Sequence, residues 1–221
     1  MMDITYVRLI VIISICGFFL GSILFSKILP RAICGIDIIE VSEDGNPGVS
    51  NVFKYCSVPV GILTALCDFG KTFAPVLAAD ILIPMEVRTP LFGLVICSGV
   101  LGHIFSIFNH GNGGMGVAPF WATLMGIFLQ CQLIIVLVII YVFIRYVFRV
   151  HAQHLRTILC FGIFLAFIAV FATNMVYKPA YMILCAVICL KCLYIAVKQK
   201  SLLGPDAVEQ QSGAGENSIN T

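Results

Sequence analysis

Charged side chains are scarce in this sequence. Asp, Glu, Lys and Arg make up 11% of the 221 residues and hydrophobic residues 60%, whereas a soluble domain carries about a quarter charged residues. The formal net charge is only +2, and no basic patch is interleaved with aromatic residues, which argues against a nucleic-acid-binding protein. A mean hydropathy of +1.05 instead indicates an integral membrane protein.

Regular alternation of polar and apolar residues is also missing. The strands of a membrane β-barrel would show it. The apolar runs of roughly 18 or more residues are too long to be core helices of a water-soluble protein. We therefore predict an all-α fold, a polytopic membrane helix bundle of about seven transmembrane helices that has the lipid bilayer as its environment.

Motifs of several enzyme classes are absent as well. The sequence has no Gly-x-Ser-x-Gly, no Walker loop and no His-Glu-x-x-His. It contains ten cysteines, but most lie inside apolar runs, where a thiol behaves as a small hydrophobic side chain. Cys189 and Cys192 form a Cys-x-x-Cys pair in a membrane segment. Because no second pair completes a site, we predict no metal.

Hydrophobic runs divide the chain into spans. The first run exceeds a signal-peptide core and no Ala-x-Ala site closes it, so we interpret it as a retained helix. The run Pro119–Phe148 would be about 45 Å long as one helix, and Gln130-Cys131-Gln132 interrupts it, which favours two short helices. The predicted segments are Val7–Leu29, Val58–Ile83, Leu91–Phe108, 115–130, 132–148, Thr157–Met175 and Ala180–Val197. We predict one transmembrane domain over 1–200 and a polar, disordered tail over 201–221.

The distribution of Lys and Arg predicts the orientation. With seven spans and the N-terminus outside, most cations fall on the inner side, whereas six spans would separate them. The inner side then holds Lys27, Arg31, Lys54, Arg145, Arg149, Arg156, Lys198 and Lys200, and the outer side holds Arg8, Arg88 and Lys178. The C-terminus and the two glycine-rich loops, the first within Pro30–Ser57 and the second within Gly102–Ala118, are therefore expected in the cytoplasm.

A polar, glycine-rich stretch, Gly102–Ala118, lies between two apolar runs. Glycines let backbone N–H groups converge, and a helix that starts at such a loop adds its positive end, so the stretch suits a phosphate or another anion. Two alternatives stay open. The glycines can serve close packing of membrane helices, and His103 can serve only to bridge helices.

An earlier polar segment, Pro30–Ser57, combines acidic residues with a turn-forming Gly/Asn/Pro cluster. Its acids match no calcium loop, so a solvated loop is favoured over a cation site. In the following span Asp68 and Lys71 lie at i and i+3 and share a helix face. They form either a structural ion pair or part of a functional site, for which a small transporter is one option.

Three stretches of the chain read as a series of motifs. Gly45-Asn46-Pro47-Gly48-Val49-Ser50-Asn51-Val52-Phe53-Lys54 is followed by Asp68, Gly70-Lys71 and Pro75-Val76, and then by Gly102-His103-Ile104-Phe105-Ser106-Ile107-Phe108 and Gly113-Gly114-Met115-Gly116-Val117-Ala118-Pro119. In order and spacing these stretches resemble motifs of the bacterial acyl-phosphate glycerol-3-phosphate acyltransferases, the PlsY family. Arg145-Tyr146-Val147 also looks like a short stretch of that family.

The resemblance implies a seven-helix enzyme of the bacterial plasma membrane. It would move an acyl group from acyl phosphate to the 1-hydroxyl of glycerol 3-phosphate and give lysophosphatidic acid, without a cofactor. Catalysis would rest on positioning and charge neutralisation, so no catalytic residue is assigned. The implied substrate-binding residues are Asn46, Ser50, Asn51, Lys54, His103, Gly113, Gly114 and Gly116, with Asp68, Lys71 and Arg145 as supporting charge. Ser50 and Asn51 have the alternative of capping the second span.

The chain also departs from the family pattern. Met115 stands at a family lysine, Ile39 at an arginine, Asp44 at a serine and Pro119 at a threonine, and the third, basic motif near the C-terminus is not recognisable. Losing two cationic contacts at about 1.5–3 kcal/mol each would lower phosphate binding or rate by roughly 10² to 10⁴. Two hypotheses follow: an active acyltransferase in which other cations compensate, and an inactive relative that binds phosphorylated lipid or a membrane-protein partner.

Overall fold

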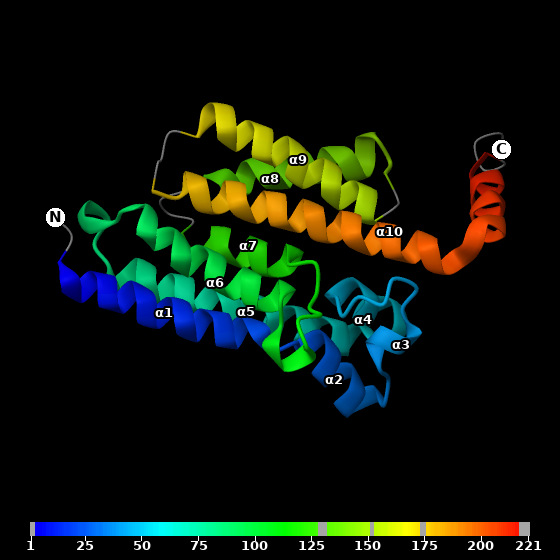
Figure 1. Ribbon diagram of the computed structural model, residues 1–221, viewed down its shortest axis with the longest axis horizontal. Helices are drawn as coiled ribbons and strands as arrows, with labels where there is room; N and C mark the ends of the chain where they lie inside the picture. Colours follow the sequence, from blue (N-terminus) through cyan, green and yellow to red (C-terminus); the bar gives the residue numbers. More distant parts are fainter. Residues whose placement is uncertain (1–2, 128–131, 151–152, 173–175, 217–221) are drawn as a thin grey trace.

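The computed structural model describes residues 3–127, 132–150, 153–172 and 176–216, with side chains up to residue 199. Every regular element in these ranges is helical, which confirms the predicted all-α fold (Figure 1). The elements are α1 (Ile4–Ser22), α2 (Phe25–Cys34), α3 (Ile38–Val41), α4 (Val49–Tyr55), α5 (Val58–Leu82), η1 (Met85–Val87), η2 (Pro90–Phe92), α6 (Gly93–Ile104), η3 (Ile107–Asn109), α7 (Val117–Gly126), α8 (Leu133–Val142), the π-helical turn η4 (Phe143–Val147), α9 (Gln153–Phe171) and α10 (Lys178–Glu216).

Five helical stretches are long and apolar enough to cross a membrane. They are Ile4–Cys34, Val58–Leu82, Pro90–Asn109, Gln153–Phe171 and Lys178–Gln199. Two shorter apolar helices, Val117–Gly126 and Leu133–Val147, replace one long helix, as the excess length of that run predicts. Of the predicted interruption, Gln130 and Cys131 lie outside the described residues. The polytopic membrane bundle is confirmed, and the number of seven crossings stays a prediction.

The helices form two layers (Figure 1). Helices α1, α5, α6 and α7 pack together in one layer, and α8, α9 and α10 lie in the other. The contact between α1 and α6 is close because glycines line it. A Cβ atom on Gly21 would lie 2.2 Å from the Gly99 carbonyl oxygen, and one on Gly102 would lie 2.2 Å from that of Phe18. Such small-residue contacts are typical of membrane helix pairs, so the packing alternative applies to Gly102.

The first span is broken, contrary to the prediction of one helix over Val7–Leu29. Helix α1 ends at Ser22, and α2 starts after a two-residue gap. The carbonyl of Ser22 accepts a hydrogen bond from Ser106 Oγ (2.5 Å), and that of Ile23 accepts one from Lys71 Nζ. The break is tolerated because both carbonyls released from the helix find donors on neighbouring elements.

The segment predicted as a loop over Pro30–Ser57 is partly helical, since it contains the end of α2 together with α3 and α4. Ser57 is the residue before α5. Ser50 and Asn51 lie in α4, so the alternative that they cap the second span is wrong. The short helices and turns of this segment gather at the end of the bundle opposite the N-terminus (Figure 1).

The second glycine-rich loop and the start of α9 lie at that same end (Figure 1). This placement agrees with a topology in which the two loops and the basic residues share one side. The basic loop predicted over Arg145–Arg156 is shorter than expected, because η4 and α9 take up its two ends. The assignment of this side to the cytoplasm stays a prediction.

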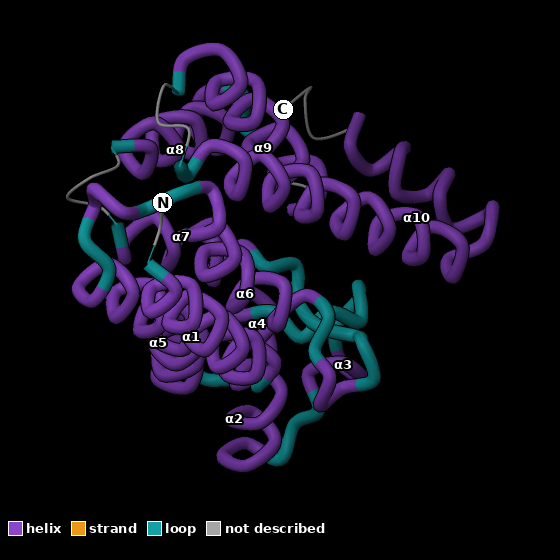
Figure 2. Tube along the Cα trace, turned by 60° about the vertical axis from the view of Figure 1, so that its left-hand side comes forward, coloured by secondary structure: helices purple, strands orange, loops and turns teal. Residues whose placement is uncertain are grey.

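Helix α10 runs past the rest of the bundle in both views (Figures 1 and 2). It contains the predicted span Ala180–Val197 and continues as helix to Glu216. The polar segment from Ser201 therefore has helical backbone where irregular structure is expected from composition, and its Leu, Ala, Glu and Gln residues favour that conformation. Residues 217–221 lie outside the description, and the separate tail stays a prediction.

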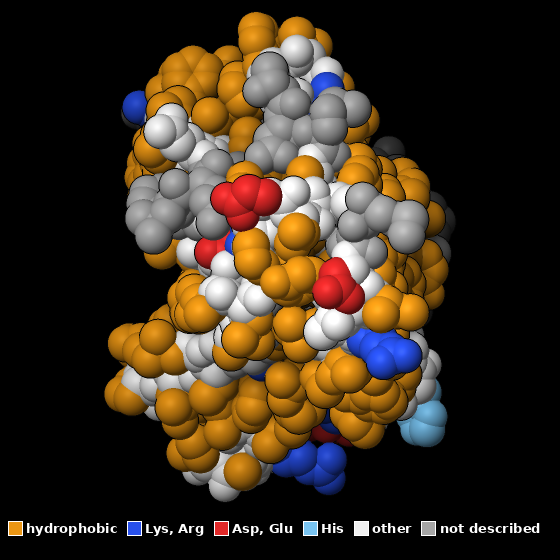
Figure 3. Space-filling view, turned by 90° about the vertical axis from the view of Figure 1, so that its left-hand side faces the viewer, with side chains coloured by type: hydrophobic (Ala, Val, Ile, Leu, Met, Phe, Trp, Pro, Cys, Tyr) orange, Lys and Arg blue, Asp and Glu red, His pale blue; other side chains and the backbone are white. Residues whose placement is uncertain are grey.

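Hydrophobic side chains dominate the molecular face in Figure 3, where charged side chains are few. Among the exposed side chains, Leu66, Ile81 and Val170 are 65%, 73% and 72% exposed. Large apolar side chains that point outward suit contact with lipid. Several polar side chains, among them Asp68 and His103, are buried instead.

Candidate functional site

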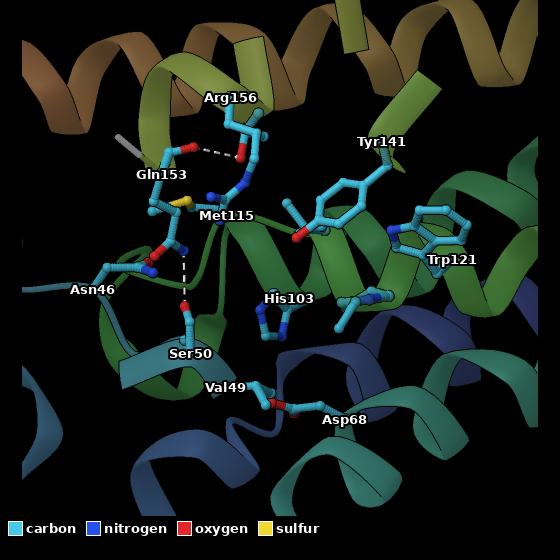
Figure 4. Close-up of a pocket in the computed structure, with 16 residues that line it drawn as sticks. Asn46, Val49, Ser50, Asp68, His103, Met115, Trp121, Tyr141, Gln153 and Arg156 are labelled. Atoms are coloured by element: carbon cyan, nitrogen blue, oxygen red, sulfur yellow. Dashed lines mark hydrogen bonds between the residues drawn. The ribbon is translucent and has the colours of Figure 1, made fainter. Parts of the chain in front are cut away.

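A cavity of about 250 Å³, the reaction cavity, lies where both glycine-rich loops meet α9. Figure 4 shows Arg156 and Met115 on one side of it, Asp68 on the other and His103 between them. Its lining residues are Asn46, Gly48, Val49, Ser50, Asp68, His103, Met115, Gly116, Val117, Ala118, Pro119, Trp121, Tyr141, Gln153, Arg156 and Thr157. The structure thus brings together the predicted Asn46, Ser50, His103 and Gly116.

The N-terminus of α7 forms one wall of the reaction cavity. Gly116 precedes the helix with a φ of 83°, a left-handed conformation that glycine adopts without strain. The first helical residues, Val117–Pro119, follow along the cavity. The first N–H groups of a helix lack partners inside the helix, and the helix dipole is positive at this end. This wall is therefore suited to an anion, as the glycine-rich sequence predicts.

The turn before α7 packs tightly against His103. A Cβ atom on Gly114 would lie 2.3 Å from His103 Nε2, and one on Gly113 would lie 1.8 Å from the His103 carbonyl oxygen. The Gly113 N–H donates to the Ile104 carbonyl (3.1 Å). Gly113 and Gly114 therefore fix the position of the loop, and neither is among the residues that line the reaction cavity.

Asp68, Lys71 and His103 form a buried polar cluster beside the reaction cavity. Lys71 Nζ lies 2.7 Å from Asp68 Oδ1 and 3.0 Å from His103 Nδ1, and it also donates to the Ile23 carbonyl. Because an ammonium group only donates, His103 Nδ1 is the acceptor, and in the neutral ring Nε2 carries the proton. Lys71 links α5, α6 and the α1–α2 break, which favours the structural ion pair among the alternatives for this residue.

Two acceptors that line the reaction cavity have spare capacity for hydrogen bonds. Asp68 is buried, and its ion pair with Lys71 leaves both carboxylate oxygens without a well-formed hydrogen bond from the described residues. The side-chain oxygen Oδ1 of Asn46 is also buried and accepts no hydrogen bond in the part of the chain described. Buried acceptors of this kind are suited to hydroxyl or amide donors of a bound molecule.

Asp44 maintains the shape of the first loop. Its Oδ1 accepts hydrogen bonds from the Asn46 backbone N–H (3.1 Å) and from Asn51 Nδ2 (2.8 Å), and its Oδ2 lies 3.6 Å from His154 Nε2. Asn51 also donates to the Asn46 carbonyl (2.8 Å). Asp44 therefore has a structural role where the family has serine. Asn51 supports the loop, and its predicted contact with substrate stays a prediction.

Three other predicted residues occupy different places. Ser50 Oγ accepts a hydrogen bond from Gln153 Nε2 (2.7 Å) and joins α4 to α9 at the reaction cavity (Figure 4). Lys54 is on the surface, 2.6 Å from Glu43 Oε1, and this hydrogen bond raises the pKa of Lys54. Arg145 lies in η4. Lys54 and Arg145 do not line the cavity, and their roles toward substrate stay predictions.

Arg156 supplies a cation from outside the motifs that carry the family resemblance. Among the described residues lining the reaction cavity it is the one Lys or Arg. Its guanidinium carbon lies 5.7 Å from the ring centroid of Tyr141, and its Nη1 donates to the Val150 carbonyl (3.4 Å). Gln153, Arg156 and Thr157 lie at i, i+3 and i+4, so they form a polar stripe at the start of an apolar helix. That stripe is the sequence signal for these three residues.

A second polar cavity of about 310 Å³, the basic chamber, lies between the two loops and α10. It shares Asn46 with the reaction cavity. The residues that line it are Ile39, Asp44, Gly45, Asn46, Pro47, Asn109, His110, Asn112, Gly113, Lys191, Tyr194, Ile195 and Lys198. Lys191 and Lys198 make the chamber basic, although no motif in the sequence pointed to them.

The described residues form neither a metal-binding cluster nor a disulfide bond. No group of three His, Cys, Asp or Glu side chains there is arranged to hold a metal ion. The nine cysteines described are free thiols. Burial, together with the neighbouring Cys34, raises the pKa of Cys56 to about 11, so this thiol is protonated at neutral pH. The two cavities instead offer N–H donors, cations and buried acceptors, which are suited to phosphate and hydroxyl groups.

A family model described as glycerol-3-phosphate acyltransferase matches residues 11–202. The chain belongs to this family. Within the glycerol-3-phosphate acyltransferase family, the relative from Hydrogenobaculum sp. is 32% identical over 163 residues, which cover 74% of this chain and 80% of the relative. The relative from Solidesulfovibrio magneticus is 34% identical over 113 residues, or 51% of this chain. The chain spans only about half the length of that relative and of the Anaeromyxobacter one, at 52% and 54%.

Two crystal structures of PlsY (YgiH), an integral membrane glycerol 3-phosphate acyltransferase, share the fold. The glycerol 3-phosphate form gives a TM-score of 0.70 and the lysophosphatidic acid form one of 0.68. Each is 22% identical and covers 88% of this chain and 91% of the other. This likeness confirms the helical membrane fold predicted for this chain.

Proposed function

We propose that the protein transfers an acyl group from acyl phosphate to glycerol 3-phosphate and forms lysophosphatidic acid at the cytoplasmic face of a bacterial plasma membrane. The observation that carries the proposal is that both glycine-rich loops, the N-terminus of α7 and Arg156 converge on one cavity. Family membership and the names of the relatives support the acyl acceptor. The acyl donor follows from the motif resemblance.

The transfer proceeds without a covalent enzyme intermediate. A hydroxyl oxygen of glycerol 3-phosphate attacks the carbonyl carbon of acyl phosphate and forms the ester bond. The bond between that carbon and the phosphate oxygen breaks, and inorganic phosphate leaves with the electron pair. The cavity offers Asp68 and Asn46 as acceptors that orient the attacking hydroxyl, and the hydroxyl proton passes to the departing phosphate as the ester forms.

Arg156 and the N-terminus of α7 bind the phosphate of the acyl donor. Negative charge grows on the carbonyl oxygen and on the departing phosphate in the transition state, and fixed donors in a partly enclosed site stabilise it. The side of the cavity lined by Trp121 and Tyr141 is aromatic (Figure 4). That side accommodates the first carbons of the acyl chain, since apolar walls favour a hydrocarbon.

Glycerol 3-phosphate, the water-soluble substrate, occupies the basic chamber. Lys191 and Lys198 bind its phosphate there. Asn46 lines both cavities, so the chamber is next to the reaction cavity, and in this proposal the hydroxyl end of the bound molecule points toward Asn46. Holding both phosphorylated substrates in fixed geometry is the main source of catalysis in this proposal.

The test measures lysophosphatidic acid made by purified protein in lipid from acyl phosphate and labelled glycerol 3-phosphate. The parent forms product. Gly114→Ala lowers the rate by about 10²-fold, because the new methyl group displaces the His103 ring that borders the cavity. Gly162→Ala is the matched control, since a Cβ atom there meets nothing within 4 Å. Absence of product from the parent, or an equal effect of the two substitutions, would contradict the proposal.

The second candidate is an inactive relative that binds phosphorylated lipid or a membrane-protein partner. It is favoured by Met115, which is 4% exposed and lines the cavity where the family has lysine. If only a Met115→Lys variant makes product, the scaffold is intact and the chemistry is disabled. If neither protein makes product, the binding role is the better account.

A further inference from the structure

A large groove lies beside the break between α1 and α2, outside both cavities used in the proposed reaction. Its volume is about 600 Å³, within the usual range for ligand sites. We call it the α2 groove, and it is lined by Ser22, Ile23, Leu24, Lys27, Ile28, Arg31, Ala32, Ser106, Phe108 and Asn109. It exists because α2 turns away at the break and leaves a gap next to residues 106–109.

The α2 groove joins an apolar surface to two cations. Ile23, Leu24 and Phe108 provide hydrocarbon. Lys27 and Arg31 lie at i and i+4 in α2, so they are about one turn apart on the same side of the helix. An apolar surface beside two adjacent cations is complementary to a lipid with one anionic headgroup.

The two cations keep most of their capacity for an anion. Lys27 Nζ donates to the neutral Asn109 Oδ1 (2.6 Å), and no salt bridge to Lys27 is formed by the residues that the structure describes. Arg31 lies 3.8 Å from Asp37, but its side chain is 71% exposed. Such an exposed, long ion pair is weak in water, so a phosphate can bind both cations at little cost.

Asn109 connects the α2 groove with the basic chamber, because it lines both. The α2 groove shares no lining residue with the reaction cavity. A phosphate that takes Lys27 away from Asn109 would change the wall between groove and chamber. The reaction cavity, the basic chamber and the α2 groove are therefore neighbours in series, with Asn46 in the wall between the first two and Asn109 in the wall between the last two.

We infer that the α2 groove binds a single-chain lipid with a phosphate headgroup, with the phosphate at Lys27 and Arg31 and the chain along Ile23, Leu24 and Phe108. The identification of this lipid as lysophosphatidic acid rests on the proposed function, which makes that molecule the product. The groove is then the site that the product occupies between the reaction cavity and the bilayer.

The experiment measures binding next to a single tryptophan placed in the groove. Trp121, the sole tryptophan of the chain, lines the reaction cavity, so Trp121→Phe combined with Phe108→Trp moves the reporter to the α2 groove. Lysophosphatidic acid with a brominated chain is titrated into this full-length protein in neutral detergent. Saturable quenching is expected, with brominated lysophosphatidylcholine requiring at least about tenfold more lipid, because a zwitterionic headgroup offers less to the two cations.

Charge variants decide whether the cations carry the binding. Lys27→Gln with Arg31→Gln raises the midpoint of quenching by about 10- to 100-fold, and Lys27→Arg with Arg31→Lys restores it, which separates loss of charge from loss of folding. Arg149→Gln, an exposed arginine away from the groove, leaves the midpoint unchanged. An unchanged midpoint in the double glutamine variant, or equal affinity for the zwitterionic lipid, overturns the inference.

Two further arms separate the sources of phosphate and the two proposals. Brominated phosphatidic acid binding as tightly as the single-chain lipid would overturn the assignment to the product in favour of a bilayer lipid, and competition by inorganic phosphate alone would overturn the need for a chain. Product formation is assayed in parallel on the protein with Trp121 retained. Charge-dependent binding without product formation would reject only the proposed function, and product formation without such binding would reject only the groove.

Discussion

Replacing Arg156 with glutamine removes the one Lys or Arg side chain among the described residues of the reaction cavity. Glutamine retains a polar tip of smaller size but no charge. A hydrogen bond to a charged group contributes about 1.5–3 kcal/mol. If Arg156 binds the phosphate group of the acyl donor, loss of this contact therefore lowers kcat/KM by roughly 10- to 150-fold.

The kinetic pattern distinguishes binding from transition-state stabilisation. If Arg156 stabilises the charge that develops on the departing phosphate, kcat falls together with kcat/KM. If it only binds the acyl donor, the KM for acyl phosphate rises and kcat is unchanged. Arg156→Lys keeps the charge but loses the planar fork, so its activity lies between that of the parent and that of the glutamine variant.

The control for this experiment is Arg149→Gln, because Arg149 is exposed and lines none of the cavities discussed. All variants are compared at equal helix content by circular dichroism and at fixed ionic strength, since salt screens exposed charges. A change in kcat/KM below twofold for Arg156→Gln, or an equal change for Arg149→Gln, would refute the assignment of Arg156 to the phosphate.

Two other substitutions test what stabilises the bundle. Lys71→Met leaves the buried Asp68 carboxylate without its ion-pair partner, so the free energy of unfolding falls by about 3–5 kcal/mol. Denaturation in detergent measures this change, and a loss below about 1 kcal/mol would contradict the structural ion pair. Arg88→Gln removes donors to Asp80 Oδ1 (2.7 Å) and Tyr177 Oη (2.8 Å) and lowers stability by a similar amount. Because Arg88 lines neither cavity, kcat measured well below the unfolding temperature stays at the parent value, and a specific loss of kcat would show that its role extends beyond stability.

The membrane spans were predictable because the thickness of the bilayer imposes a length on apolar runs. The break after Ser22 was not. The chain there is apolar, with no Pro at the break, and the carbonyls of Ser22 and Ile23 are satisfied by Ser106 and Lys71. Those donors are far away in the sequence, so no local pattern reveals that a helix can end at this point.

The site was predictable to the extent that motifs place residues at fixed backbone positions. Gly116 and His103 lie at the reaction cavity because the turn before α7 requires close contact with the end of α6. Lys54 belongs to the same motif series, but its long side chain turns to Glu43 on the surface. Side-chain direction depends on the partners available in the folded chain, and a motif does not specify these partners.

Arg156 shows the complementary case. It belongs to none of the motifs that carried the resemblance, and in the sequence it is one of several basic residues between two apolar runs. Only the placement of α9 against α4 and α7 makes it part of the reaction cavity. Both Arg156 and Met115 line that cavity and lie on the same side of it in Figure 4. The hypothesis that follows is that a cation from α9 takes the role that the family gives to a lysine in the glycine-rich loop.

A double-substitution cycle tests this exchange of cations. If Arg156 has replaced the family lysine, Met115→Lys changes the activity of the parent little, because a cation is already present. In the Arg156→Gln background the same Met115→Lys substitution restores about tenfold in kcat/KM, since it returns one positive charge to the same cavity. Met115→Gln is the control, as it has similar length and polarity without the charge.

The outcome depends on coupling between the two positions rather than on either variant alone. Residues that act on one group are expected to be coupled by about 0.5–3 kcal/mol, whereas independent residues give additive effects. Additive effects of Met115→Lys and Arg156→Gln would mean that the two positions act on different groups. Arg156 would then have its own function in the cavity, and the missing lysine would remain without a substitute.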